Sequence, residues 1–338
     1  MKEYPNYNLL KNNTFGLYSL CRRFLDLETA EEVAQLPQYI GQEDFPLLII
    51  GGGSNLLLTK DYPATVVHAA IKGWEIIGET SADILVRCGA GETWDDFVEW
   101  TIGQGGYGLE NLSAIPGEVG ASAVQNIGAY GVEAKDFIHA VEAVEIITGE
   151  YFKFTNFQCE YAYRDSKFKN EWRDRFIITH VTYRLSKTFR PCVDYGNVKA
   201  ALEQRHLKAP TAKDMRQLIM DVRAEKLPDY HEEGNAGSFF KNPVVSYGKF
   251  EKLREVYPRI PYFLQDDGEV KIPAGWLIET CGWKGKCVGN AGVHEKQALV
   301  LVNKGGASGE EVLELCRQIC QTVRENFGIE LQPEVNIR

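Results

Sequence analysis

Residues 115–131 read IPGEVGASAVQNIGAYG, a run whose glycines and alanines leave the backbone almost bare of bulk. Glycine costs conformational entropy on folding, so many glycines in one loop indicate unusual turns or close approach of another group. A second loop of this kind, Gly51 to Asn55, follows the apolar run Leu47 to Ile50. Two such loops in one half of the chain predict a large cofactor that carries phosphate.

Composition places the chain among soluble globular proteins of two or three domains. It has 338 residues, of which 44% are hydrophobic and 25% charged. No signal peptide follows Met1 and no apolar run approaches the ~20 residues that span a bilayer. The expected location is the cytoplasm, without membrane insertion. The net charge of −10 argues against nucleic-acid binding and implies that an anionic substrate is held by a few placed Lys and Arg residues.

The cysteines and histidines do not form a metal-ligand pattern. The eight cysteines are scattered without a Cys-x-x-Cys pair, and none of the six histidines forms a His-x-x-x-His pair. No metal site is expected. Cys316 and Cys320 share a helical face with apolar residues, as buried thiols in a reducing compartment would.

The first half of the chain is predicted to alternate strands and helices. Short apolar runs rich in β-branched residues predict strands at 45–50, 65–68, 84–88 and 176–185. A hairpin is predicted from 141–147 and 151–154, with its turn at Thr148-Gly149. Thr29-x-x-Glu32 and Thr93-x-x-Asp96 fit capping boxes, and the second opens a helix that ends at Gly105-Gly106.

The second half of the chain shows a less regular pattern of predicted elements. Residues 191–210 are expected to be a loop, and Thr211-x-x-Asp214 to cap a following helix. Ser308-x-x-Glu311 caps the most regular helical pattern in the chain, which Gly328 ends. A strand is predicted at 329–335. Neither an internal repeat nor a low-complexity linker occurs.

Neither glycine loop matches a standard nucleotide motif. At Gly51 the third glycine of a dinucleotide fingerprint is replaced by Leu56, and no Gly-Lys-Ser/Thr follows as in a P-loop. The loop could hold an anion on backbone N–H groups, and a plain tight turn explains it equally well. In the second loop Gly120 and Ala121 leave room for a planar group, and Asn126 can donate and accept; the alternative is a small-residue crossover packed against a helix.

Together with three further segments, the two loops resemble the UDP-N-acetylenolpyruvoylglucosamine reductase (MurB) family in its tyrosine-loop form. The segments are YRDS at 163–166, GSFFKNP at 237–243 and PEV at 333–335, in the order that the family has them. The resemblance runs from Asn13-Thr14-Phe15 to the C-terminus. It implies an α+β fold with a vanillyl-alcohol-oxidase-type (PCMH) FAD-binding domain and a C-terminal α+β substrate-binding domain.

The resemblance also implies the reaction and its cofactors. The enolpyruvyl ether of UDP-N-acetylglucosamine would be reduced to UDP-N-acetylmuramate for peptidoglycan synthesis, with NADPH as electron donor and non-covalent FAD as carrier. The expected FAD-binding residues come from both loops: Gly51, Gly52, Gly53, Ser54, Asn55, Ile115, Pro116, Gly117, Val119, Gly120, Ser122, Asn126, Ile127, Gly128, Ala129, Tyr130 and Gly131.

Three residues map onto the catalytic positions of the family. Arg164 would grip the substrate carboxylate, where a guanidinium stabilises the charge of an enolate-like intermediate. Ser238 would protonate the alpha carbon, and Glu334 would polarise Ser238 or a water. The non-catalytic alternatives for these three residues are an ion-paired arginine, a turn or N-cap serine and a solvated C-terminal carboxylate.

Further positions map onto the substrate contacts of the family: Tyr163, Tyr195, Arg223, Lys226, Asn242 and Gln297. Lys226 and Tyr195 suit the diphosphate, and Tyr195 falls in the loop that is thought to close over UDP. After Glu334 the sequence has Asn336, where some members have a basic residue.

The resemblance further implies the domain limits. They are 13–187 for the FAD-binding domain with two subdomains, 188–227 for a linker with the tyrosine loop and a helix, 228–328 for the substrate domain, and 329–338 for a strand that returns to the active site. A monomer is expected. Two rival functions remain: a flavin oxidase with the cofactor joined to His68, His139 or His180, and a non-catalytic nucleotide-sugar binder.

Overall fold

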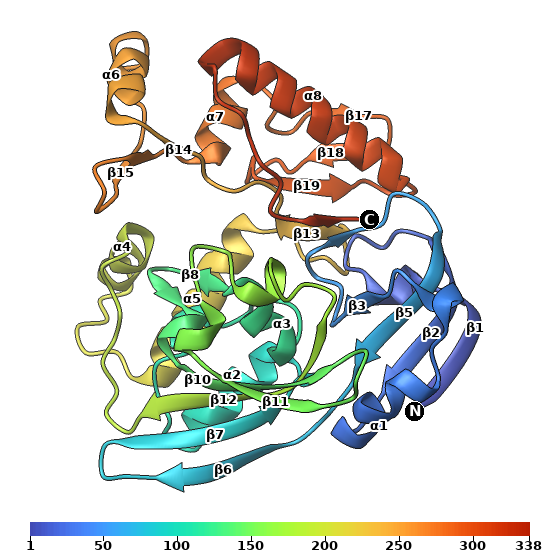
Figure 1. Cartoon of the computed structure of the whole chain (residues 1–338). Helices are drawn as coiled ribbons and strands as arrows, with labels where there is room; N and C mark the ends of the chain where they lie inside the picture. Colours follow the sequence, from blue (N-terminus) through green and yellow to red (C-terminus); the bar gives the residue numbers. More distant parts are fainter. The chain divides into compact units, whose positions relative to one another are not determined.

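The chain forms two compact units, each assembled from three segments (Figure 1). The computed structural model describes residues 1–338, apart from the side chains of residues 196 and 197. Unit 1 comprises Met1–Tyr7, Leu20–Gly53 and Pro63–Glu225. Unit 2 comprises Asn8–Ser19, Ser54–Tyr62 and Lys226–Arg338. Each unit has its own hydrophobic core.

Unit 1 contains two main sheets and a small hairpin. Strands β1 (Lys2–Asn8), β2 (Leu20–Leu27), β3 (Leu48–Ile50) and β5 (Tyr62–Ala69) form the first, in the order β1-β2-β5-β3. Strands β6 (Trp74–Glu79), β7 (Asp83–Gly89), β10 (Ile138–Glu145), β11 (Tyr151–Thr155) and β12 (Phe176–Ser186) form the second, in the order β11-β10-β12-β7-β6. The pairs of the second sheet are antiparallel, whereas β3 and β5 are parallel. Strands β8 (Gly128–Ala129) and β9 (Val132–Glu133) form the hairpin.

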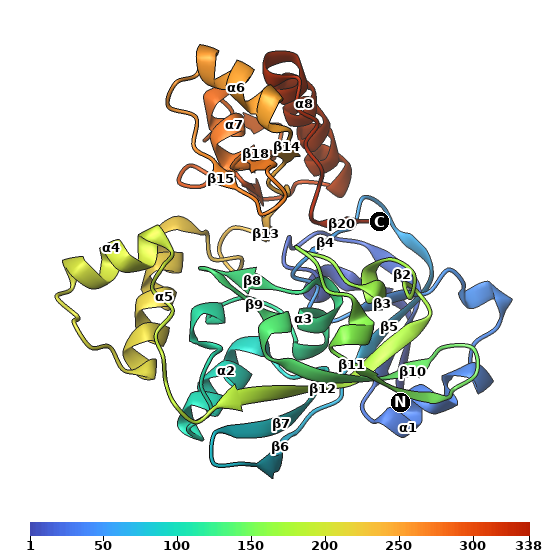
Figure 2. The same cartoon turned by 60° about the vertical axis from the view of Figure 1, so that its left-hand side comes forward.

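The helices of unit 1 are α1 (Ala30–Gln35), α2 (Trp94–Gly103), α3 (Val119–Gln125), α4 (Gly196–Gln204) and α5 (Ala212–Lys226). Helices α2 and α3 lie over one face of the five-stranded sheet (Figure 2). The rings of Trp94 and Phe97 from α2 pack on Tyr183 of β12, and all three side chains are fully buried. Large aromatic side chains contribute much buried apolar area, so this cluster fixes α2 on the sheet.

Unit 2 is built around a four-stranded antiparallel sheet. Strands β13 (Asn235–Ser238), β17 (Cys287–Val288), β18 (Ala291–Val293) and β19 (Val300–Asn303) form it in the order β13-β19-β18-β17. Strands β14 (Val244–Val245), β15 (Phe263–Leu264) and β16 (Val270–Lys271) form a smaller sheet, and β20 (Asn336–Ile337) pairs in parallel with β4 (Leu56–Leu57). The helices are α6 (Tyr247–Val256), α7 (Ala274–Thr280) and α8 (Gly309–Phe327).

Helix α8 confirms the strongest local prediction. Ser308 and Glu311 form the expected capping box, with the Glu311 amide donating to Ser308 Oγ at 3.2 Å and the Ser308 amide to Glu311 Oε2 at 2.8 Å. Gly328 ends the helix in the left-handed conformation at φ 62°. The strands predicted in the first half of the chain, the hairpin and the helices that begin near Trp94 and Ala212 are also confirmed.

Three local predictions were wrong. The segment 191–210 contains helix α4, because Val198 and Leu202 lie one turn apart and bury themselves against α5. Thr93 makes no side-chain cap bond; the Trp94 amide donates instead to the Gly117 carbonyl at 3.0 Å. Only β20, at 336–337, is a strand after Gly328, since Pro333 cannot donate to a ladder and forms a single bridge with Phe240.

Cys316 and Cys320 lie on α8 as free thiols, the first buried and the second half-buried. Within the described part of the chain, no helix combines the length and apolar character needed to cross a bilayer.

Candidate functional site

The two glycine loops meet in unit 1. A Cβ atom placed on Gly52 would lie 3.4 Å from the Cα of Gly117, and one on Gly51 would lie 3.0 Å from Glu118 Oε2. Gly53 and Gly117 have φ of 64° and 117°, which few other residues adopt. Two loops that are distant in the sequence therefore pack closely here, because Gly51 and Gly52 carry no Cβ that would meet Glu118 and Gly117.

Backbone hydrogen bonds fix the second loop to the end of β7. The amide of Val119 donates to the Glu92 carbonyl at 2.9 Å, and that of Gly120 to the Ala90 carbonyl at 2.8 Å. A Cβ on Gly120 would lie only 2.8 Å from the Cβ of Ala90. The expected space beside Gly120 is therefore filled by protein, and the glycine is needed for helix–strand packing.

Ser122 and Asn126 are both buried and use their polar groups within the protein. The Ser122 hydroxyl donates to the Val119 carbonyl at 2.7 Å and lies 2.7 Å from the Tyr183 hydroxyl. The Asn126 amide donates to Glu133 and to the Ala162 carbonyl, and its oxygen accepts from the Lys135 amide at 2.9 Å. Asn126 thus organises the loop. The sequence showed that its side chain can donate and accept hydrogen bonds, but not which groups it bonds to.

The other residues expected at the cofactor occupy two kinds of position. Val119 and Ile127 have buried side chains in the core. Ile115, Pro116, Gly128, Ala129 and Tyr130 are half-buried, and Gly131 is exposed with φ 82°. Ser54 and Asn55, at the end of the first loop, belong to unit 2.

Arg164 is held beside the second loop. Its backbone is left-handed at φ 56°, and its guanidinium donates to the carbonyls of Asn126 and Gly128. A Cβ on Gly128 would lie 3.0 Å from Arg164 Nη1, so this glycine makes room for the guanidinium. The guanidinium carbon also lies 5.6 Å from the ring centre of Tyr163.

A second arginine lies close enough to act electrostatically on Arg164. Arg223 of α5 donates through Nε to the Ala114 carbonyl at 3.2 Å. Burial lowers the pKa of its guanidinium and Arg164 adds to the lowering, while Tyr130 and Asp95 oppose it. Two arginines that repel one another electrostatically favour an anion beside them.

Aromatic rings border these arginines. Tyr130 meets Tyr195 edge to face, with ring centres 5.8 Å apart. Burial raises the pKa of the Tyr130 hydroxyl, and Arg223 opposes that shift. Tyr195 precedes α4 and is exposed. Unit 1 thus brings together Arg164, Arg223, Tyr163, Tyr130 and Tyr195 from distant parts of the sequence.

Unit 2 places Ser238 and Glu334 side by side in the backbone. Gly237, at φ 68°, precedes the exposed Ser238 at the end of β13. The amide of Glu334 donates to the carbonyl of Phe239 at 2.8 Å. Phe239 and the following residue, Phe240, are buried, so the backbone next to the exposed Ser238 is held in the core of unit 2.

Asn55 and Asn336 tie this region together. Asn55 Nδ2 donates to the Glu334 carbonyl at 3.3 Å, and the Asn336 amide and side chain both donate to the Asn55 carbonyl at 3.1 Å. Asn336, at the position where a basic residue was considered, therefore acts as a structural link to the end of the first loop.

The remaining substrate candidates have local roles in unit 2. Asn242 accepts the Ala274 amide at 2.9 Å at the start of α7. Gln297 accepts the Leu299 amide at 3.3 Å. Lys226, the last residue of α5, is half-buried.

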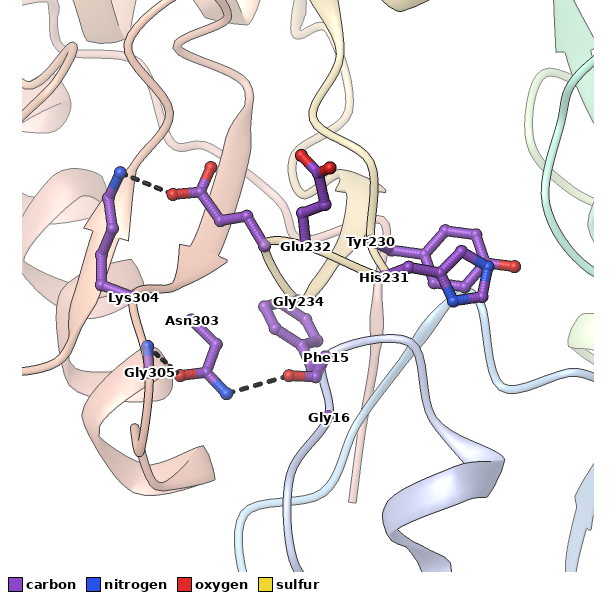
Figure 3. Close-up of a pocket in the computed structure, with 10 residues that line it drawn as sticks. Phe15, Gly16, Tyr230, His231, Glu232, Gly234, Asn303, Lys304 and Gly305 are labelled. Atoms are coloured by element: carbon purple, nitrogen blue, oxygen red, sulfur yellow. Dashed lines mark hydrogen bonds and ion pairs between the residues drawn. The ribbon is translucent and has the colours of Figure 1, made fainter.

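A hollow of about 280 Å³ lies elsewhere in unit 2 and was not predicted (Figure 3). Its lining includes Phe15, Tyr230, Asn303 and Lys304. The Lys304 ammonium pairs with Glu233 at 2.6 Å, so opposite charges on this lining neutralise one another. None of the residues expected from the sequence lines it.

His68 was considered only as a point of covalent flavin attachment, and its surroundings were missed. Its Nδ1 lies 2.7 Å from Asp26 and its Nε2 3.0 Å from Glu118. Both ring nitrogens therefore have carboxylate partners, which disfavours a covalent bond to either. In the described residues no group of three or more His, Cys, Asp or Glu side chains could hold a metal ion.

Comparisons with known proteins agree with the fold described above. A family model described as "FAD binding domain" matches residues 22–155, and one described as "UDP-N-acetylenolpyruvoylglucosamine reductase, C-terminal domain" matches residues 229–338. A solved reductase of this name (MurB) from Thermus caldophilus superposes with a TM-score of 0.66 at 24% identity, over 99% of this chain and 98% of that one. The expected fold, an FAD-binding domain with a C-terminal α+β domain, is confirmed.

Full-length relatives carry the same name. The UDP-N-acetylenolpyruvoylglucosamine reductase of Bacteroides fragilis (strain YCH46) is 49% identical over 330 residues, 98% of each chain. That of Flavobacterium johnsoniae is 46% identical over 339 residues, 100% of each chain. The chain therefore belongs to the UDP-N-acetylenolpyruvoylglucosamine reductase family.

Proposed function

We propose that this protein is an NADPH-dependent flavoenzyme that reduces UDP-N-acetyl-3-O-(1-carboxyvinyl)glucosamine to UDP-N-acetylmuramate in peptidoglycan synthesis. The observation that carries the proposal is the 49% identity to a named reductase over 98% of both chains. The two arginines near the second loop and the Ser238–Glu334 pair in unit 2 supply the groups that this reaction needs.

The glycine surface of unit 1 fits FAD. Cβ atoms on Gly51 and Gly52 would meet Glu118 and Gly117, so only a bare backbone permits this shape, and such a surface suits a diphosphate and a flat ring. When bound, FAD accepts a hydride from NADPH and delivers it to the vinyl carbon. Gly51 to Asn55 and residues 115–131 are the proposed contacts, with Ser122 and Asn126 acting through the fold of the loop.

Arg164 is the proposed partner of the substrate carboxylate. The carbonyls of Asn126 and Gly128 fix its guanidinium, so little reorganisation is needed on binding. A fixed guanidinium can hold a carboxylate at two points and stabilises the negative charge that develops beside it in the enolate.

Ser238 is the proposed proton donor. Its Oγ–H would pass the proton to the alpha carbon of the enolate, which is basic enough to take it from a weak acid. Glu334, one hydrogen bond away along the backbone, would polarise this hydroxyl directly or through a water.

The remaining cationic and aromatic groups are proposed for UDP. Since the chain has a net charge of −10, attraction for a nucleotide diphosphate must come from placed cations. Arg223, Lys226 and Tyr195 are the candidates, with Tyr163, Asn242 and Gln297 as further contacts.

The test is spectroscopic and kinetic. The purified protein should be yellow, should release free FAD on heating, and should oxidise NADPH only when the enolpyruvyl substrate is added, with UDP-N-acetylmuramate identified by mass. A colourless protein that binds the nucleotide sugar would favour the non-catalytic binder. Flavin that stays attached after heating would favour the covalent oxidase.

A further inference from the structure

His68 lies at the base of the first glycine loop. It belongs to β5 and pairs in parallel register with Ile50, the residue directly before Gly51. Its side chain is only 16% exposed. The imidazole is thus built into the sheet from which the loop emerges.

The partners of His68 require the charged form of the ring. Nδ1 lies 2.7 Å from Asp26 Oδ1, and Nε2 lies 3.0 and 3.1 Å from the two oxygens of Glu118. A carboxylate only accepts hydrogen bonds, and a neutral imidazole has only one N–H to donate. Only the imidazolium can satisfy both sides. Burial lowers the pKa of His68, but Glu118 and Asp26 outweigh it and raise that pKa above its ordinary value.

Glu118 joins the two loops. Its backbone follows Gly117 in the second loop, and its Oε2 lies 3.0 Å from the position of a Cβ on Gly51 in the first. A carboxylate here would repel a diphosphate unless a cation compensates it. The charged groups facing His68 are Asp26 from β2 and Glu118 from the second loop; Lys2 and Tyr7 of β1 lie near Asp26.

We propose that His68, as the imidazolium, is a positioning residue that couples the two glycine loops through Glu118 and offsets its charge, so that FAD binds more tightly when His68 is protonated. This inference takes FAD as the ligand and so rests on the proposed function. It assigns a role to a side chain that does not itself need to touch the cofactor.

The test measures the Kd for FAD against pH. Purified holoenzyme is diluted between pH 6 and 9, and the fluorescence of released FAD gives the Kd. Since the protonated form predominates below the raised pKa of His68 and is lost above it, the wild-type Kd should rise with pH by up to about tenfold per pH unit. His68→Asn should bind FAD more weakly at pH 6 and show no such rise.

Two further variants make the test specific. Glu118→Gln removes the carboxylate whose charge His68 offsets, so the rise in Kd with pH should be largely lost. His139→Gln alters an exposed imidazole on β10 and should keep the wild-type curve. Thermal melting confirms that each variant folds, and the loss of the rise in Kd in Glu118→Gln tests the proposal if His68→Asn does not fold.

A wild-type Kd that is constant from pH 6 to 9, or an unchanged slope in folded His68→Asn, would overturn the inference. Tight but pH-independent FAD binding would leave the proposed function standing. Failure to bind FAD at any pH would overturn the proposed function, and this inference with it.

Discussion

Ser238 offers the most direct test at the scale of one residue. Its hydroxyl is exposed while Phe239 behind it is fully buried, so Ser238→Ala removes one oxygen from an anchored strand. In the proposed reaction, protonation of the alpha carbon occurs only in the second half-reaction. We expect reduction of the flavin by NADPH to be unchanged and its reoxidation by the enolpyruvyl substrate to slow by about 10²–10⁴-fold in stopped-flow absorbance.

Ser246→Ala is a matched control, since Ser246 caps α6 in the same unit by accepting the Lys249 amide. It should cost about 1 kcal/mol of stability and leave both half-reactions intact. Equal slowing of both half-reactions in Ser238→Ala would remove Ser238 from the proposed role.

Gly128 tests the placement of Arg164. A Cβ at Gly128 would lie 3.0 Å from Arg164 Nη1 and 2.9 Å from the Val132 carbonyl, so Gly128→Ala must displace one or both. Because small misplacements of a binding group are costly, kcat/KM for the enolpyruvyl substrate should fall about 10²-fold in steady-state assays.

Gly103→Ala is the corresponding control, since nothing lies within 4 Å of a Cβ placed there. It should leave kcat/KM unchanged. Wild-type kinetics in Gly128→Ala would show that the guanidinium does not depend on this glycine.

The residue types at the site were predictable from the sequence, whereas their partners were not. Asn126 was expected at a ligand because its side chain can donate and accept, and Ser122 because of the family resemblance. In the fold these groups bond to Ala162, Lys135 and Tyr183, which lie as much as 61 residues away along the chain. Which of several polar groups a side chain meets depends on tertiary packing, and local sequence does not encode it.

At the scale of elements, an ion pair joins α2 to α5. Arg216 of α5 donates to Asp95 of α2 at 2.5 and 3.0 Å, and the Ala114 amide also donates to Asp95. Burial alone would raise the pKa of Asp95, but these donors lower it. An aspartate with a lowered pKa stabilises the fold above the pKa of the unfolded chain, about 3.9, and this contribution is lost as the pH falls through the folded value.

Asp95→Asn should therefore lower the free energy of unfolding at pH 7 by about 1–3 kcal/mol and flatten its decline below about pH 5, measured by urea denaturation. Asp96→Asn changes the exposed neighbour on the same helix and should retain the wild-type pH dependence. An acid limb in Asp95→Asn as steep as in wild type would contradict this account.

Elements were predictable where the pattern is local. Helix α8 has its apolar stripe, its capping box and its terminal glycine within one continuous segment. Helix α4 was missed because, from residue 198 onward, only the side chains of Val198 and Leu202 are buried in it, and their partners lie on α5. The apolar alternation after Gly328 was real, since Ile329 and Leu331 are buried, but burial without a ladder does not make a strand.

At the scale of the whole molecule, we predict that NADPH and the sugar nucleotide use one site in turn. The sequence matches a single FAD-binding model, and its Gly-x-Gly-x-x-Gly pattern at 103–108 follows α2 instead of opening a helix as a dinucleotide fingerprint does. Initial-rate plots against both substrates should give parallel lines, the ping-pong pattern. Intersecting lines would indicate a ternary complex and two sites.

The sequence did not predict that segments distant from one another along the chain form a single unit. Short segments, Asn8–Ser19 and Ser54–Tyr62, belong to the same unit as the last third of the chain. Such membership depends on pairs such as β4 with β20, whose partners are distant in sequence. Hydrophobic periodicity reports that a segment is buried but not against which distant segment it packs.

The pairing of β4 with β20 has a consequence for biosynthesis. Asn55 and Asn336 are 281 positions apart, so Asn55 leaves the ribosome long before Asn336 is added to the chain. During translation, Leu56 and Leu57 lack their partner strand. An unpaired apolar strand edge is prone to aggregation and to binding by chaperones. This pairing in unit 2 can therefore form only after Asn336 and Ile337 have been synthesised.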